Sequence, residues 1–337
     1  MHDIPLMSGR RVAFAGSRAA WLATILLVLS LLSLGAALLL GSVAVSPREI
    51  VMSFWSAQDP VTYDIVWRLR APRAFAAFTC GGLLALAGAL LQVLLRNPLA
   101  DPYVLGVSSG ASLGALAALA AGMSMLVVDT AALAGALGAI ALVFALSYRP
   151  GGWNMYRVLL TGVVLSAGLA ALISLSLLLA PQAQVKGMLF WLMGDLSHAE
   201  APTAAALVLC LVLAGSWAGG VQLDLLSLGD AKAQSLGIRV PVVQVVVFFA
   251  AAVATVAAVM LGGAVGFVGL MVPHAIRLLG AIRHRALLPL AVLLGGSFLT
   301  AADTVARAAW APQQLPVGIL TALLGVPAML LLLGRVR

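Results

Sequence analysis

The stretch "GGLLALAGALLQ" (residues 81–92) contains no charged side chain and has small residues spaced four apart. It lies inside an apolar run, residues 73–94, that is about as long as the roughly 20 residues a helix needs to cross a bilayer. Small residues at this spacing let helix backbones approach closely in lipid, where contacts between large apolar side chains add little. The stretch therefore predicts a membrane-spanning helix packed tightly on its neighbours, and "GVSSGASLGALAALAAG" (106–122) predicts the same.

The composition points the same way. Of 337 residues, 63% are hydrophobic and 9% are charged, whereas a soluble domain has roughly 25% charged residues. The net charge of +8 would suit nucleic acid, but the basic residues lie in the gaps between apolar runs, which indicates membrane topology and no nucleic-acid partner. Cys80 and Cys210 each lie in an apolar run, so we expect neither a disulfide nor a metal site.

The sequence predicts about ten spans. Because apolar runs of this length must satisfy their own backbone hydrogen bonds in lipid, and do not alternate as barrel strands do, we expect helices. The fold class is thus an all-α polytopic membrane protein with one domain over residues 1–337. The predicted spans are 21–42, 73–94, 104–121, 126–147, 157–180, 201–218, 241–261, 265–282, 286–308 and 315–334.

Basic residues set the orientation. The first run is long enough to be a retained span rather than a signal peptide. With the N-terminus in the cytoplasm, 13 of the 19 Lys and Arg residues fall inside, which predicts that both termini are cytoplasmic. The outside residues are either arginines that snorkel at helix ends or a basic surface for an acidic partner. They are Arg48, Arg68, Arg70, Arg73, Lys186 and Arg307.

Two interruptions rich in Gly and Pro follow corresponding spans. One is "ALLQVLLRNPLADPYVLGVSSGA" (89–111), after the second span, and the other is "GGAVGFVGLMVPHAIRLLG" (262–280), after the seventh. These two spans run in opposite directions in the predicted topology. The pattern predicts an inverted repeat of spans two to five and seven to ten, a common transporter plan.

Chemistry for catalysis is missing from the sequence. There is no GxxxxGK[ST] loop, so we expect the chain itself not to hydrolyse ATP, and no HExxH or paired Cys/His pattern, so we expect no catalytic or metal-binding residues. The spans hold almost no charge; Asp303 and Arg307 lie near the outer end of the ninth, where a solvated i,i+4 pair is worth about 0.2–0.5 kcal/mol. An ion-coupled carrier needs charge near the midplane, so a partner should supply the energy.

Seven motifs in order give the chain a family resemblance. The chain, over roughly residues 20–335, resembles the permease subunits of type II ABC importers, the family that takes up vitamin B12, ferric siderophores and haem. The motifs are "RLRAPR" (68–73), "RNPLADPYVLGVSSGA" (96–111), "LLTGVVLSAG" (159–168), "FWLMGDL" (190–196), "LSLGDAKAQSLGI" (226–238), "GFVGLMVPHAIR" (266–277) and "LPVGILTALLGVPAMLLLL" (315–333).

This resemblance implies a partner set. It implies a homodimer in the bacterial inner membrane, two copies of a cytoplasmic ATPase that hold ATP and Mg, and a periplasmic substrate-binding protein, with no cofactor on this chain. The implied function is import of an iron chelate, either a ferric siderophore or haem. Alternatives are cobalamin import by the same mechanism and, less in keeping with the sequence, an ion-coupled secondary carrier.

The polar stretch "LLSLGDAKAQSLGIRV" (225–240) interrupts the apolar sequence. By resemblance, residues 225–238 are cytoplasmic coupling helices, joined by a turn near Gly237, that sit in a cleft of the ATPase. The alternative is an ordinary solvated loop. The candidate coupling residues are Leu228, Gly229, Asp230, Ala233, Leu236 and Gly237.

The resemblance also implies docking and gate residues. Arg70, Arg73 and Arg307 would receive acidic side chains of the binding protein, and guanidinium groups suit carboxylate partners. The inner gate and pathway would include Asn97, Pro98, Leu99, Ser108 and Ser109. Trp191 and Met193 follow the fifth span, where they would either contact cargo or anchor the segment in the interface.

Overall fold

The structure is a computed structural model that describes residues 8–55, 60–149, 152–153, 155–197, 199, 202–309, 311 and 313–334. Its elements are α1 (Ser8–Leu39), α2 (Pro47–Trp55), α3 (Pro60–Tyr63), a π-helix η1 (Asp64–Arg70), α4 (Ala71–Leu94), a 3-10 helix η2 (Pro102–Leu105), α5 (Val107–Ala120), α6 (Met125–Ser147), β1 (Tyr148–Arg149), β2 (Gly152–Trp153), α7 (Met155–Leu179), α8 (Gln182–Met193), α9 (Pro202–Ala218), α10 (Gly220–Leu226), α11 (Asp230–Ser235), α12 (Val240–Gly262), α13 (Val268–Leu278), α14 (His284–Ala308) and α15 (Val317–Leu333).

The predicted fold class is confirmed, because ten helices fall on the ten predicted spans. In the described residues, six helices are long and apolar enough to cross a membrane, and α9 with α10 makes a seventh if that bent pair counts as one span. Three shorter apolar helices, α5, α13 and α15, complete the set. Among the residues that the structure describes, the only strands are β1 and β2, which pair antiparallel between α6 and α7.

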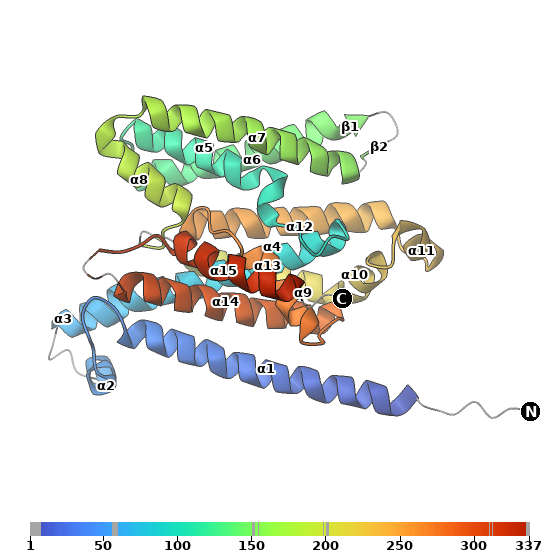
Figure 1. Ribbon diagram of the computed structural model, residues 1–337, viewed down its shortest axis with the longest axis horizontal. Coiled ribbons are helices and arrows are strands. Elements are labelled where there is room, and N and C mark those ends of the chain that lie inside the picture. The colour runs from blue at the N-terminus through green and yellow to red at the C-terminus, as the bar shows by residue number, and fades with distance from the viewer. Residues whose placement is uncertain are drawn as a thin grey trace, which may run out of the picture.

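Helix α4 lies at the centre of the bundle (Figure 1), where it contacts α9, α12, α13 and α14. Its glycines allow these contacts, as the small-residue spacing predicts. A Cβ on Gly81 would lie 2.2 Å from the carbonyl oxygen of Gly295 in α14, and one on Gly88 would lie 1.9 Å from that of Gly269 in α13. No side chain fits at such distances, so backbone meets backbone along α4.

The two four-helix groups repeat each other with opposite direction. Figure 1 shows α4 and α12 running in opposite directions, and each packs on the short second helix of the other group, α13 and α5 respectively. Both short helices begin from a left-handed residue, Gly106 at φ 77° and Phe267 at φ 69°. The Tyr103 hydroxyl joins the two interruptions, since it donates to the Val265 carbonyl and accepts from the Val265 amide, each at 2.8 Å.

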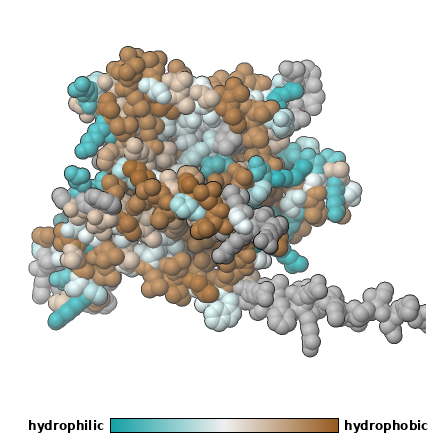
Figure 2. All heavy atoms as spheres, in the orientation of Figure 1, coloured by the Kyte–Doolittle hydropathy of each residue, from teal (hydrophilic) through white to brown (hydrophobic). Residues whose placement is uncertain are grey.

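The surface of the bundle suits lipid. Figure 2 shows apolar side chains over most of the visible face, with hydrophilic ones gathered toward the two ends. Only 11% of the apolar window in α7 is buried within the chain, so most of that helix is left for lipid or a partner. The start of α1, the end of α15 and the short helices α10 and α11 lie at one end of the bundle. Helices α2 and α3 lie at the opposite end, which is called the outer end below because the predicted orientation places it outside the cytoplasm.

The α4–α13 contact gives a direct test. Gly88→Ala places a methyl group against the Gly269 carbonyl and should lower the free energy of unfolding by about 2–3 kcal/mol through overpacking. Gly138→Ala is the matched control, because a Cβ there meets nothing within 4 Å. Buried Cys80 reports unfolding through a thiol-reactive dye, in a Cys210→Ser background because Cys210 is exposed. Equal unfolding temperatures for the two variants would contradict the close contact.

Candidate functional site

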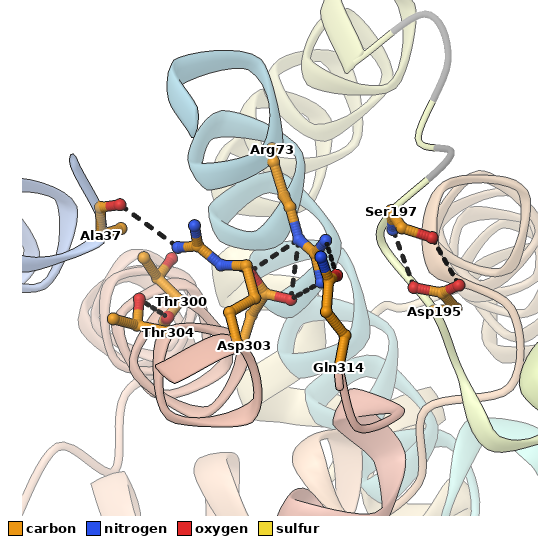
Figure 3. Close-up of polar contacts among 9 residues, drawn as sticks. Ala37, Arg73, Asp195, Ser197, Thr300, Asp303, Thr304 and Gln314 are labelled. Carbon is orange, nitrogen blue, oxygen red and sulfur yellow. Dashed lines mark hydrogen bonds and ion pairs between the residues drawn. The ribbon is translucent and has the colours of Figure 1, made fainter. Parts of the chain in front are cut away.

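An ion-pair cluster lies at the outer end, between the start of α4 and the end of α14. Arg73 donates from Nε to both carboxylate oxygens of Asp303 at 3.1 Å, and from Nη2 to Oδ1 at 2.8 Å. Arg307, one turn along α14, donates from Nε to Oδ2 at 3.1 Å. Figure 3 shows Arg73 and Asp303 directed toward each other from different helices. The Asp303 side chain is 1% exposed, so one buried carboxylate serves two guanidinium groups.

The other side-chain donors of Arg73 and Arg307, together with those of Arg70, form hydrogen bonds with neighbouring segments of the chain. Arg307 Nη2 donates to the Ala37 carbonyl in α1 at 3.2 Å, and Arg73 Nη1 donates to Gln314 Oε1 at 2.8 Å. Arg70 Nη1 donates to the Leu38 and Leu39 carbonyls at 2.7 and 3.0 Å, and its Nη2 donates to the Val43 carbonyl. The arginines therefore satisfy the carbonyls that the C-terminal end of α1 leaves open.

The sequence treats Asp303 and Arg307 as a local, solvated pair, and the structure corrects this. The pair is buried, and Arg73, 230 residues away from Asp303 in sequence, completes it. Removing one partner from a buried pair leaves an uncompensated charge, which costs about 3–5 kcal/mol rather than a few tenths. No local spacing signals the Arg73–Asp303 contact.

These arginines line a polar cavity of about 260 Å³. Arg70 and Arg307 are almost fully buried, whereas the Arg73 side chain keeps 12% of its surface exposed. Three guanidinium groups against one carboxylate leave the site positively charged, which suits an anionic group. The lining residues are Gly41, Ser42, Val43, Ile65, Leu69, Arg70, Arg73, Ser197, Arg307 and Gln314.

At the other end, α10, the link after it, α11 and the turn that follows α11 (220–237) form what we call the foot. The chain bends by 65° between α9 and α10, and α11 then carries the polar sequence. Leu228 in the link and Leu236 just after α11 are each about half exposed, while Ala233 is buried. The predicted turn near Gly237 is wrong: the turn between the short helices is at Gly229 (φ 101°), and Gly237 (φ 86°) follows α11.

The foot contacts the predicted inner gate. Asp230 forms an ion pair with Arg96, which stands at the start of the "RNPLADP" loop with a left-handed φ of 48°. Gln244 of α12 donates to the same Asp230 carboxylate at 3.2 Å. Asp230 thus joins the foot to both the gate loop and the start of α12.

The predicted gate residues split into exposed and enclosed sets. Asn97, Pro98 and Leu99 are exposed, and Asn97 Oδ1 accepts from the Leu99 amide at 2.9 Å. Ser108 is buried in α5 and Ser109 is half-buried. The two sets are separated by η2, so the exposed loop residues and the enclosed serines differ in their access to solvent.

An open, largely apolar cavity of about 490 Å³ lies beside the gate loop. Burial raises the pKa of the Asp101 carboxyl at its edge, and a hydrogen bond from the Tyr103 amide partly opposes this rise. Asp101 and Phe267 were not among the predicted site residues. Phe267 stands out in the structure because its backbone is left-handed, with a φ of 69°. The lining residues are Asp101, Tyr103, Val163, Ser166, Gly266, Phe267 and Leu270.

The outer segment α8 ends against the start of α15. A Cβ on Gly263 would lie 2.4 Å from the Trp191 carbonyl oxygen, and one on Gly318 would lie 2.0 Å from that of Met193. Trp191 is half-buried, and Met193 keeps 39% exposure. The backbone of this segment is therefore anchored by close packing, while Met193 still presents its side chain. In the described ranges, no group of three or more His, Cys, Asp or Glu side chains could hold a metal.

Comparisons with known proteins agree with this architecture. The family model described as the FecCD transport family matches residues 25–335. The chain is 42% identical to the cobalamin import permease BtuC of Halobacterium salinarum over 80% of this chain and 73% of that one. It is 37% identical to the hemin transport permease HmuU of Yersinia pestis (93% and 95% covered) and 31% identical to the molybdate permease MolB of Haemophilus influenzae (91% and 92%).

A solved structure gives the same fold. A chain described as an inward-facing conformation of a metal-chelate type ABC transporter superposes with a TM-score of 0.83 at 30% identity, covering 93% of this chain and 99% of that one. The fold and the comparisons define the membrane permease subunit of an ABC importer. The chain belongs to the FecCD transport family.

The buried carboxylate gives a second test. Asp303→Ala leaves Arg73 and Arg307 without their carboxylate and should lower the free energy of unfolding by about 3–5 kcal/mol. Asp64→Ala is the control, because Asp64 also pairs with an arginine at i,i+4, Arg68, but both side chains are more than half exposed. That exposed pair should contribute less than about 1 kcal/mol. Similar losses in the two variants, measured by thermal unfolding, would refute the assigned difference.

Proposed function

We propose that this permease moves a metal chelate from the periplasm to the cytoplasm, and that the foot receives the motion of a partner ATPase. The observation that carries this is the foot itself: a polar, half-exposed pair of short helices on a bundle whose sequence has no phosphate-binding loop. With the foot facing a cytoplasmic ATPase, both termini are cytoplasmic as well. ATP and Mg belong to the ATPase, and this chain holds no cofactor.

The cargo we propose is an iron chelate, a ferric siderophore or haem. Support comes from the hemin permease among the relatives and from the metal-chelate type transporter of the same fold. Cobalamin is the second candidate, favoured by 42% identity to a cobalamin permease. Stimulation of ATPase activity by the cognate binding protein loaded with ferric siderophore, haem, cobalamin or molybdate distinguishes these cargoes.

The permease acts as a homodimer with the pathway between two copies. Helix α7 leaves most of its apolar surface uncovered, and the cavity lined by Val163, Ser166 and Phe267 opens along it. A second copy would cover α7 and close the open side of this cavity. The exposed residues Asn97, Pro98 and Leu99 then form the inner gate, and Met193 lies near the outer one.

The foot makes a sharp target for substitution. Leu228→Asp or Leu236→Asp places a charge in an apolar contact and should weaken ATPase association by about tenfold or more, as for an interface hot spot. Val51→Asp, at a comparably exposed position on α2 at the outer end, is the control. Association is measured by titrating labelled ATPase onto the permease in nanodiscs. Wild-type affinity in both leucine variants would rule out the foot as the receiving surface.

The polar cavity at the outer end is the proposed docking point for an acidic residue of the substrate-binding protein. All three arginines already have partners, Arg73 through Asp303 and Gln314, but Arg73 keeps the largest exposed share, 12%, and is the one that an incoming carboxylate would reach. An incoming carboxylate would lie against its guanidinium group, with Arg70 and Arg307 adding positive charge behind it.

This docking point can be tested at Arg73. Arg73→Gln removes the charge but keeps an amide donor, and should weaken binding-protein affinity about tenfold at low salt, with a smaller salt dependence. Arg68→Gln is the control, because Arg68 is an exposed arginine at the same end that does not line the cavity. Affinity is measured at two salt concentrations, with unfolding temperature checked in parallel. An unchanged affinity and salt slope in Arg73→Gln would exclude the cavity.

A further inference from the structure

One side chain of the foot, Asp224, forms hydrogen bonds with the start of helix α14. The His284 backbone amide donates to Asp224 Oδ1 at 2.9 Å, and His284 Nδ1 lies 2.5 Å from the same oxygen. His284 is the first residue of α14, whereas the residue before it, Arg283, makes no side-chain cap hydrogen bond. Asp224 of α10 therefore accepts a hydrogen bond from the first backbone amide of α14. This is the task that the side chain of a helix's own N-cap residue normally performs.

The contact is largely enclosed. The His284 side chain is about 5% exposed and that of Asp224 about a third exposed. His284 Nε2 is buried and has no hydrogen-bond partner in the described part of the chain, so its hydrogen bond to Asp224 is what fixes the ring. Breaking the contact is costly because the buried His284 ring would be left without a hydrogen-bond partner, whereas Asp224 could still be hydrated.

Two further contacts, one packing contact and one cation–π contact, involve Arg285, the residue after His284. A Cβ on Gly220 would lie 2.6 Å from Cγ of Arg285, so the first residue of α10 packs directly on the arginine stem. The Arg285 guanidinium carbon lies 5.3 Å from the Trp217 ring centroid, in a cation–π contact with the end of α9. The start of α14 is thus attached to the chain at the 65° bend between α9 and α10.

At its far end α14 carries Asp303 and Arg307, which build the outer cluster with Arg73. One continuous 25-residue helix therefore runs from the foot to the docking cavity. A displacement of α10 must either break the Asp224–His284 contact or move the start of α14. Rigid helices can carry such displacements. Pro289 removes one backbone hydrogen bond near the start of α14, and the helix continues unbroken beyond it to Ala308.

We propose that Asp224 and His284 are positioning residues that couple the foot to α14, so that movement of the foot by the ATPase reaches the outer cluster. This role rests on the proposed function of the foot as the surface that receives the ATPase. It differs from that function because the two residues need not touch the ATPase. They set how much of its motion is converted into transport.

The experiment measures cargo delivered per ATP hydrolysed, with the full complex of permease, ATPase and cargo-loaded binding protein in liposomes. Asp224→Ala should lower this ratio about tenfold, within the range typical of coupled sites. Asp224→Asn keeps an acceptor for both His284 groups and should recover the ratio to within about threefold of wild type. Asp64→Ala, which removes an exposed carboxylate at the outer end, should leave the ratio unchanged.

A double-mutant cycle shows whether Asp224 and His284 act through the contact between them or independently of each other. Asp224→Ala removes both hydrogen bonds to His284, whereas His284→Ala removes only the one to the ring. The double variant should therefore lower the ratio no further than Asp224→Ala alone; independent sites would add. ATPase association and unfolding temperature are measured on every variant, and His284→Ala, which loses the ring contact to Asp224, serves where Asp224→Ala does not fold.

Coupling through α14 is supported if cargo per ATP falls while the ATPase stays bound, and if the asparagine variant restores it. The role is overturned if the ratio stays at the wild-type value, or falls only in proportion to lost ATPase binding or lower stability. Unaltered ATPase binding in Leu228→Asp and Leu236→Asp would instead remove the foot's own function, and with it the premise for Asp224. The two failures are therefore distinguishable.

Discussion

Backbone-to-backbone contact along α4 is the constraint on which the rest of the bundle depends. Lipid gives apolar side chains little reason to prefer each other to acyl chains, so helices associate through close packing and polar contacts. Gly81 and Gly88 let α4 approach α14 and α13 until carbonyls fill the space of missing side chains. That approach places Arg73, near the start of α4, beside Asp303 near the end of α14. The outer cluster follows from the central packing.

Charge is scarce in this chain, and the described part of it places charge mainly at the ends of the bundle. At the outer end, Asp303 neutralises part of the charge of Arg73 and Arg307, whose remaining donors bind α1 and the loop before α15. At the other end, Asp224 and Asp230 join the foot to α14 and to the gate loop. Hence the apolar middle is left for packing and lipid, and each end holds a set of polar contacts between helices distant in sequence.

Much of the fold can be predicted from the sequence, because a lipid bilayer requires each span to be a helix of a certain length made mostly of apolar residues. Run length located ten helices, and small-residue spacing marked the close contacts of α4 and α5. Polarity marked the foot, although not its turn, because Gly229 and Gly237 are equally permissive and only the folded chain shows which one separates the two helices. The sequence pattern within a segment therefore predicted which residues form helices, but it predicted less well where the chain turns between them.

The contacts that build the sites were mostly hidden for a different reason. Arg73 with Asp303, Arg96 with Asp230 and His284 with Asp224 each join segments at least 60 residues apart. No periodicity within one helix records such a pairing. The family resemblance identified the arginines as a group. It did not reveal that the guanidinium group of Arg70 is already hydrogen-bonded to the carbonyls at the end of α1.

The inverted repeat explains why the two ends are built differently on one plan. The groups share a long first helix, a short second helix and a left-handed residue before it, and Tyr103 fastens one interruption to the other. Yet the polar additions are not repeated: α14 carries Asp303 and Arg307, whereas its counterpart α6 carries neither at the equivalent end. The shared frame places the two interruptions in equivalent positions, and the asymmetric charges make the two ends of the bundle chemically different. That difference is what the proposed roles of the foot and the outer cluster require.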